Sequence, residues 1–287
     1  MQEKKRGRTH SRWLLPAALV LAGAAWFENF TLSTSTVTAA CAALPEAFSG
    51  LRIVQISDLH GRRFDAESRY LLELVRLQSP DLIALTGDLA DEFTDFSMLP
   101  PLLDGLTALA PTFYVTGNHE WVLSREKREA LFSMLDAAGV VRLQNEYRLL
   151  KKGQASIVLA GVDDPNGPYD QKRPAQLVRE IRQSRGRDAY ILMLSHRNDE
   201  LDLWANMGVQ TVLCGHGHGG IVRLPFAGAV FGTHLDLFPD YTAGLYQKGQ
   251  TSMIVSRGLG GSRKLPLRIG NRPEIVTVIL KAESGKV

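Results

Sequence analysis

Residues 212–221 read Val-Leu-Cys-Gly-His-Gly-His-Gly-Gly-Ile, an apolar run that ends abruptly in a glycine-rich turn with two histidines. His216 and His218 are spaced i, i+2, so in extended chain both side chains point the same way and can reach a common site. The flanking glycines let the backbone bend without the steric cost of a Cβ atom. This pattern indicates a metal site at the end of a β-strand; a flexible polar loop that holds two histidines is the alternative.

Four further apolar runs end in side chains that can bind a metal. Their motifs are Ser57-Asp58-Leu59-His60, Thr86-Gly87-Asp88-Leu89-Ala90-Asp91, Thr116-Gly117-Asn118-His119-Glu120 and Ser195-His196. In α/β proteins, ligands bind at the sheet edge where strands end. Asp, Asn and His form a hard to borderline ligand set. Such a set suits Zn, Mn or Fe and does not indicate a soft thiolate site. The five strand ends together favour the metal-site interpretation.

Composition and charge limit the classes of function. The chain has 287 residues, of which 45% are hydrophobic, so it can bury the full core of one large domain. The net charge is +3, but residues 1–12 hold five basic residues against one acidic residue, which leaves about −1 on the rest. A near-neutral domain gives no electrostatic basis for binding nucleic acid, and no nucleic-acid partner is expected.

The N-terminus has the layout of a targeting segment. The basic tail at residues 1–12 is followed by fifteen uncharged residues, 13–27, with aromatic side chains at both ends. We expect a signal-anchor that holds the chain in the cell membrane, with the catalytic domain outside the cytoplasm. Fifteen residues are few for a span, which usually needs about 17–25. Cleavage after Ala25 with secretion of the domain, or a cytoplasmic hydrophobic tail, are the alternatives.

The remaining chain divides into three parts. Residues 28–50 are predicted to be a linker or edge strand, residues 51–281 the catalytic domain, and residues 282–287 a C-terminal tail. From residue 51 onward, apolar strand patterns alternate with helical ones, and beyond Gly220 strand patterns dominate. Strands linked by helices, followed by a strand-rich end, predict an α/β (α+β) fold with two packed mixed β-sheets flanked by helices.

In this order, the motifs resemble those of the calcineurin-like metallophosphoesterase superfamily. The matching positions are Asp58-x-His60, Gly87-Asp88-x-x-Asp91, Gly117-Asn118-His119-Glu120, the lone His196, and Gly215-His216-x-His218. The resemblance runs from about residue 51 to residue 280 and implies a four-layer αββα sandwich. Within the superfamily, the chain looks most like a membrane-associated bacterial branch of small phosphodiesterases, through residues 160–165, 223–226, 255–260 and 271–274.

The resemblance also implies two divalent metal ions, Mn, Zn or Fe. By motif match, the first ion would be held by Asp58, His60 and His218, the second by Asn118, His196 and His216, and Asp88 would bridge both. Two dications roughly 3.5–4 Å apart repel one another, and a shared carboxylate and hydroxide lower that cost. Such a pair would activate a hydroxide as the nucleophile at neutral pH.

Two further residues match the family's acid–base pair. His119 would face the leaving-group oxygen as a proton donor, and Asp91 would orient that histidine and keep it protonated. A structural loop histidine and a solvated carboxylate at a helix start are the alternatives. The residue between the last two histidines is commonly Thr in the resembled branch; here it is Gly217, and we expect a looser turn.

These features predict a metal-dependent phosphoesterase that hydrolyses a phosphodiester, pyrophosphate or phosphomonoester bond. A site beside a membrane favours a lipid-, cell-wall- or nucleotide-linked substrate. One alternative is a pyrophosphatase for a nucleotide-linked lipid of the UDP-diacylglucosamine type. The other is a non-catalytic binding scaffold, which the retained ligand positions and His119 disfavour.

Overall fold

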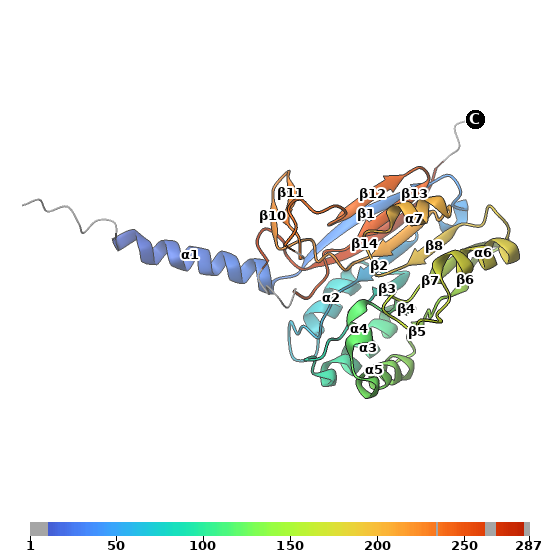
Figure 1. Cartoon of the computed structure of the whole chain (residues 1–287). Helices are drawn as coiled ribbons and strands as arrows, with labels where there is room; N and C mark the ends of the chain where they lie inside the picture. The colour runs from blue at the N-terminus through green and yellow to red at the C-terminus, as the bar shows by residue number, and fades with distance from the viewer. Residues whose placement is uncertain (1–10, 234, 262–267, 284–287) are drawn as a thin grey trace, which may run out of the picture.

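A computed structural model of the chain describes residues 11–233, 235–261 and 268–283. The predicted basic tail at residues 1–12 and the predicted C-terminal tail at residues 282–287 lie largely outside these ranges. The described chain folds into two six-stranded sheets, a small hairpin and flanking helices (Figure 1).

The first sheet has the strand order β1-β14-β2-β3-β4-β5. Its strands are β1 (Ser33–Cys41), β14 (Glu274–Ala282), β2 (Arg52–Ile56), β3 (Leu82–Thr86), β4 (Thr112–Val115) and β5 (Val141–Arg142). The four strands from β2 to β5 are parallel, whereas β14 runs antiparallel to β2. The edge strand β1 comes from the segment predicted to be a linker or edge strand, and it pairs in parallel with β14.

The second sheet has the strand order β12-β13-β9-β8-β7-β6. Its strands are β12 (Gly244–Lys248), β13 (Thr251–Val255), β9 (Thr211–Cys214), β8 (Ile191–Leu194), β7 (Ala155–Gly161) and β6 (Glu146–Lys152). The four inner strands are parallel, and the two edge strands run antiparallel to their neighbours. A separate hairpin joins β10 (Val222–Leu224) to β11 (Gly228–Phe231).

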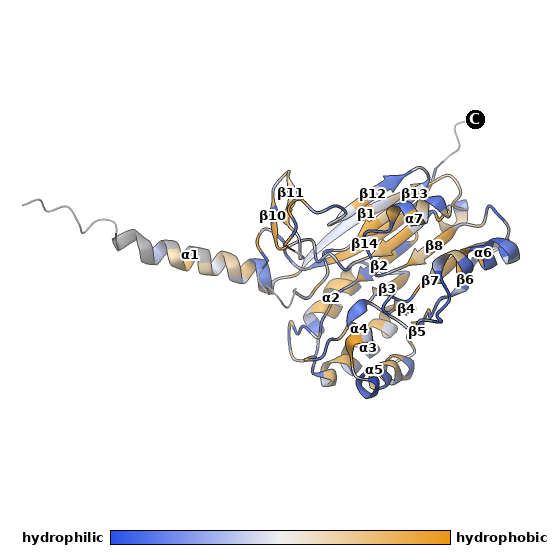
Figure 2. Ribbon diagram, viewed as in Figure 1, coloured by the Kyte–Doolittle hydropathy of each residue, from blue (hydrophilic) through white to orange (hydrophobic). Residues whose placement is uncertain are grey.

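Helices cover the outer face of each sheet. Those on the first sheet are α2 (Arg69–Leu77), α3 (Leu99–Leu109), α4 (Asn118–Val122) and α5 (Arg125–Ala137). Those on the second are α6 (Pro174–Arg185) and α7 (Leu201–Asn206). Two short 3-10 helices, η1 (Glu46–Phe48) and η2 (Phe96–Met98), lie in the connections. Hydrophobic residues gather along the central strands, whereas α5 and α6 carry many hydrophilic residues (Figure 2).

Three buried clusters account for the layering. The strands β2, β3 and β4 are parallel and buried on both faces, so they are mostly apolar and do not alternate between polar and apolar residues. Ile83 and Leu85 pack toward the helices of the first sheet, and Ala84 packs toward the second sheet. On the far side, Trp204 of α7 packs on the outer face of the second sheet. The predicted fold of two packed mixed sheets flanked by helices is confirmed.

The prediction of a membrane anchor at residues 13–27 is wrong. This segment lies in α1 (Ser11–Phe30), which extends away from the sandwich in Figure 1. In the described ranges, every helix is too short or too polar to cross a membrane. The apolar run has only fifteen residues, fewer than the roughly 17–25 that a span usually needs.

Candidate metal centre

The predicted ligands stand where strands of the two sheets end side by side. Asp58 and His60 follow β2, and Asp88 follows β3, in the first sheet. His196 follows β8 in the second sheet. The glycine-rich turn with His216 and His218 follows β9, which is also in the second sheet. Asn118 and His119 begin α4 directly after β4. The site therefore lies where the strand ends of both sheets converge, which explains why the motifs are far apart in sequence.

Among the described residues, three overlapping groups of side chains could each hold a metal ion. They are Asp58, His60 and His218; His60, Asp88 and His119; and Asp88, His196 and His216. Within each group, the ligand atoms lie within 4.8 Å of one another. Asp88 and His60 each belong to two groups. The structure therefore brings together every aspartate and histidine predicted as a ligand, and it adds His119 to one group.

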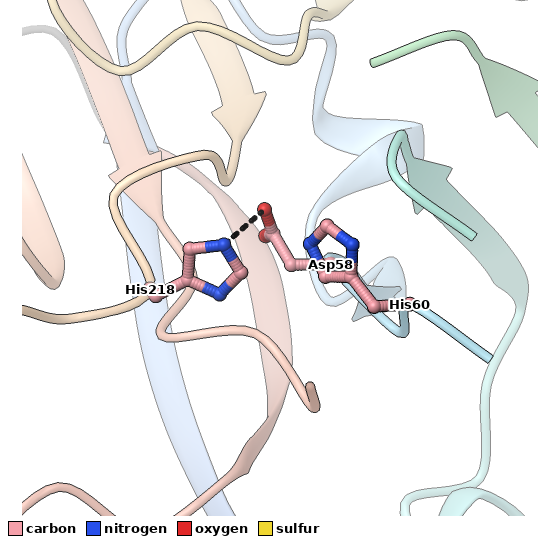
Figure 3. A group of neighbouring side chains, drawn as sticks. All are labelled: Asp58, His60 and His218. Carbon is pink, nitrogen blue, oxygen red and sulfur yellow. Dashed lines mark ion pairs between the residues drawn. The ribbon is translucent and has the colours of Figure 1, made fainter. Parts of the chain in front are cut away.

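The three side chains of the first group lie next to one another (Figure 3). Asp58 is fully buried, and its Oδ1 atom lies 3.8 Å from Nε2 of His218. The rings of His60 and His218 stack with centroids 5.0 Å apart. Both ring nitrogens of His60 and Nδ1 of His218 are buried and, within the described chain, have no hydrogen-bond partner. A buried lone pair without a donor is costly unless a Lewis acid binds it, so these side chains fit a divalent metal.

Burial also sets the charge of this first group. Loss of hydration lowers the pKa of His60 to about 4 and lowers that of His218 well below its ordinary value. Both imidazoles are therefore neutral near pH 7 and have lone pairs for a metal. Burial raises the pKa of Asp58 to about 6, against the opposing positive charge of His196. A bound dication would favour the ionised carboxylate of Asp58.

The second group is built around His196. Its Nδ1 atom lies 2.9 Å from the carbonyl oxygen of Thr86, which requires a proton on Nδ1 and turns Nε2 toward the site. From Nε2, the distances are 3.2 Å to Asp88 Oδ2, 3.2 Å to Asn118 Oδ1 and 3.2 Å to His216 Nδ1. Four potential ligand atoms thus face one another at this point.

Asp88 and His196 form a buried pair in the metal-free protein. Burial opposes ionisation of both, but their mutual attraction outweighs it. As a result, the pKa of Asp88 lies far below its ordinary value, and that of His196 rises to about 10. A proton shared by these ligand atoms occupies the place where a cation would lie, so metal binding should release it.

The backbone at these ligands is unusual. Residues with positive φ angles include Asp58 (51°), His60 (49°), Asp88 (53°), His216 (66°) and His218 (50°). Residues other than glycine seldom adopt this left-handed backbone conformation, and those that do cluster at functional sites. The glycine before Asp88 is needed for close approach, since a Cβ atom on Gly87 would lie 2.6 Å from Nδ1 of His196.

The predicted acid–base pair lies beside the predicted metal ligands. The backbone N–H of His119 donates to Asp88 Oδ1 at 2.9 Å, and its ring meets that of His60 edge-on at 4.7 Å between centroids. Asp91 is buried, and its Oδ2 atom lies 3.7 Å from Nδ1 of His60. The structure thus adds a neighbour for Asp91, and the predicted role of Asp91 in orienting His119 stays a prediction.

Glu120, for which the sequence had predicted no role, organises this part of the site. Its fully buried carboxylate accepts hydrogen bonds from the backbone N–H groups of Gly117 at 2.7 Å and Asp88 at 2.9 Å. Burial, together with the negative charge of Asp88, raises the pKa of Glu120 to about 7. The motif Gly-Asn-His-Glu contained this residue, but only the tertiary structure shows that it ties the loop after β3 to the loop after β4.

A further pair, Arg197 and Asp164, lies on the other side of His216. Arg197 Nη1 lies 3.0 Å from Nε2 of His216, and Arg197 also bonds twice to Asp164, from Nε at 2.6 Å and from Nη2 at 3.1 Å. The carboxylate of Asp164 is fully buried beneath Arg197. In the sequence, the signal that could have identified Arg197 was its position directly after His196.

The turn that carries His216 and His218 is held in place by two further buried residues. Asn271 donates from Nδ2 to the carbonyl oxygens of His218 at 2.8 Å and Gly220 at 2.6 Å. Arg268 is 3% exposed and donates to the carbonyl oxygen of His218 at 3.3 Å. Both residues precede β14, so the C-terminal part of the chain fixes the position of His218.

Comparison with known proteins agrees with this geometry. The family model for calcineurin-like phosphoesterases matches residues 51–220, the part that carries every predicted ligand. The chain belongs to the calcineurin-like phosphoesterases. It is 31% identical to the uncharacterized metallophosphoesterase YkuE of Bacillus subtilis, covering 90% of this chain and 89% of that protein. It is also 31% identical to the phosphodiesterase YaeI of Escherichia coli, covering 80% and 82% of the two chains.

Family membership and the site together establish the general activity. A calcineurin-like phosphoesterase with buried aspartate and histidine clusters compatible with divalent metals is a hydrolase of phosphoric esters. The predicted enzyme class and the predicted superfamily are confirmed.

Proposed function

We propose that this calcineurin-like phosphoesterase hydrolyses phosphodiesters with two divalent metal ions. The observation that carries the proposal is the overlap of the three ligand groups through Asp88 and His60. Asp58, His60 and His218 would hold one ion, Asn118, His196 and His216 the other, and Asp88 both. When bound, the two ions would lower the pKa of a water molecule to supply a nucleophile and would offset the charge of the phosphoryl group.

The protein's own groups keep these ligands in place. The carbonyl oxygen of Thr86 accepts from Nδ1 of His196 and directs Nε2 toward the site, where it would give up its proton on binding a metal. The backbone N–H of His216 donates to Asp58 at 3.0 Å, which couples the loops of the two sheets. Because these hydrogen bonds are buried and directional, the proposed ligand side chains need little rearrangement to bind metal ions.

His119 is proposed to donate a proton to the leaving-group oxygen. Its backbone is fixed by Asp88, and its ring lies against His60, so the imidazole stands at the border of the ligand groups. We retain Asp91 as the carboxylate that supports this histidine, with the catalytic unit at residues 51–281. The name of the similar YaeI protein supports a diester rather than a monoester. A lipid-, cell-wall- or nucleotide-linked diester stays a proposal.

Metal analysis and a substrate panel test the proposal. The purified protein should contain two equivalents of Mn, Zn or Fe and should hydrolyse bis(p-nitrophenyl) phosphate faster than p-nitrophenyl phosphate. Treatment with EDTA should abolish the activity, and one of the three metals should restore it. Full activity after complete removal of metal would overturn the mechanism, and a preference for the monoester or for a nucleotide-linked pyrophosphate would overturn the substrate class.

A further inference from the structure

Arg197 occupies a fixed position at the edge of the metal centre. It lies between β8 and α7, next to His196, and its Nη1 atom is 3.0 Å from Nε2 of His216. The opposite nitrogen of that imidazole, Nδ1, faces His196 at 3.2 Å. Only one imidazole ring therefore separates the guanidinium group from the proposed ligand atoms.

Asp164 holds this guanidinium group in one orientation. Its two carboxylate oxygens bond to Nε and Nη2 of Arg197, which leaves Nη1 directed at the metal centre. Asp164 has its own supports, because its backbone N–H donates to Thr116 and its Oδ1 accepts from the N–H of Asn166. A buried carboxylate fixed on both sides makes Arg197 rigid, so little entropy is lost when Nη1 binds another group.

Arg197 also borders the open space around the site. A cavity of about 450 Å³ is lined by Arg197, Asn198, His216 and Gly217, among others. Another of about 240 Å³ is lined by Asp164, His196 and Arg197, among others. The Arg197 side chain is 23% exposed, whereas that of Asp164 is fully buried. The arginine is thus the solvent-facing member of the pair.

We propose that Arg197 binds a non-bridging oxygen of the substrate's phosphoryl group and that Asp164 is its positioning residue. This inference rests on the proposed function, since it needs a phosphate ester at the metal centre. Arginine suits the task because its charge is permanent and its planar fork binds a carboxylate on one side while donating to phosphate on the other. A donor aimed at the phosphoryl oxygens also stabilises charge that develops during hydrolysis.

A purely structural role makes different predictions. Arg197 could serve only to join the loop that carries Asp164 to the loop that carries His216. In that case, its loss would lower the thermal midpoint and leave phosphate affinity unchanged. The chain offers a matched control in Arg142, which makes the same two-bond pair with Asp136 at 2.7 and 2.9 Å and is 20% exposed.

The test measures binding of inorganic phosphate to the metal-loaded protein by calorimetry, together with KM and kcat for bis(p-nitrophenyl) phosphate, metal content and thermal midpoint. Arg197→Gln should weaken phosphate binding by about 10- to 100-fold and lower kcat/KM at least as much, while retaining metal. Arg197→Lys should recover part of the affinity, because it restores the charge but not the fork. Asp164→Asn should weaken phosphate binding by a smaller factor, and Arg142→Gln should not change it.

The outcomes separate this inference from the proposed function. If the unaltered protein binds metal but hydrolyses no phosphate ester, the proposed function fails. If the unaltered protein is active, and Arg197→Gln and Arg197→Lys bind phosphate as tightly as it does, the inference about Arg197 fails alone. Should Arg197→Gln fold poorly, Arg197→Lys decides the question, and its unchanged phosphate affinity would overturn the inference.

Discussion

The Nδ2 atom of Asn198 lies 2.6 Å from the point where a Cβ atom would stand on Gly217. The same Nδ2 atom donates to the carbonyl oxygen of Tyr241 at 2.7 Å. The glycine between His216 and His218 therefore leaves room for the Asn198 side chain, which binds a neighbouring loop. The space at Gly217, expected from sequence to loosen the turn, is filled by Asn198.

Gly217→Ala should therefore displace Asn198 and break its bond to Tyr241. We expect a loss of about 1 kcal/mol in the free energy of unfolding, the usual value for one such hydrogen bond. Urea unfolding of Gly217→Ala, Asn198→Ala and the double variant forms a double-mutant cycle. The effect of Gly217→Ala should shrink in the Asn198→Ala background, and equal effects in both backgrounds would contradict this packing argument.

Asp88→Asn should remove metal from the protein and abolish hydrolysis. The amide oxygen carries no full charge and cannot balance two cations in the way that a shared carboxylate does. Metal content and activity should fall together. A control, Asp104→Asn on the exposed surface of α3, should retain both. Retention of two metal equivalents by Asp88→Asn would argue against a bridging role.

His119→Ala should separate metal binding from catalysis. We expect the variant to retain its metal while kcat falls by on the order of 10²–10⁴, the typical contribution of a general acid. The loss should be smaller for a diester with a good leaving group, such as p-nitrophenolate, than for an alkyl ester, because a good leaving group needs less protonation. Loss of metal in this variant would instead make His119 a ligand, a role that its place in one of the ligand groups allows.

Glu120→Gln should destabilise the site through its hydrogen bonds. The Oε2 atom of the carboxylate accepts from the backbone N–H groups of Gly117 and Asp88, and its Oε1 atom accepts from that of Ala90, whereas an amide would direct its NH2 group at the donors on one of these two sides. We expect a loss of about 1–3 kcal/mol in unfolding free energy. The exposed Glu126→Gln should change it by less than about 0.5 kcal/mol. Thermal and urea unfolding of the metal-free proteins would measure both, and similar values would refute the buried-acceptor role.

In the metal-free protein, the contribution of His60 should lower the free energy of unfolding as the pH falls from about 6.5 to about 4. In that window the unfolded chain protonates His60 at its ordinary pKa near 6.5, while the folded pKa is about 4, so acid favours unfolding. Asp58 and Glu120, whose pKa values are raised, contribute in the opposite direction. Comparison with His60→Gln isolates the histidine.

The measurement for His60 is the urea midpoint of EDTA-treated protein at pH 4 to 7. The midpoint of His60→Gln should fall less toward low pH than that of the unaltered protein. Parallel curves for the two proteins would mean that His60 is not held neutral by burial.

The sequence by itself determined the strands and the residue types at their ends. These are local properties: apolar runs predict buried strands, and the Asp, Asn and His residues that follow them predict a site at the sheet edge. The same local argument failed at residues 13–27, where an apolar run beside basic residues suggested an anchor although its fifteen residues are few for a span.

The tertiary structure alone decided which atoms meet. The backbone N–H of His216 reaches Asp58 across 158 residues because the strand ends of the two sheets converge. Arg197 reaches Asp164 across 33 residues because they follow β8 and β7, which are neighbours in the second sheet. The roles of Glu120, Arg197 and Asn198 depend on such distant partners and on burial, which sets the charge of each group. No local pattern encodes them, since hydrogen bonds and desolvation are properties of the packed chain.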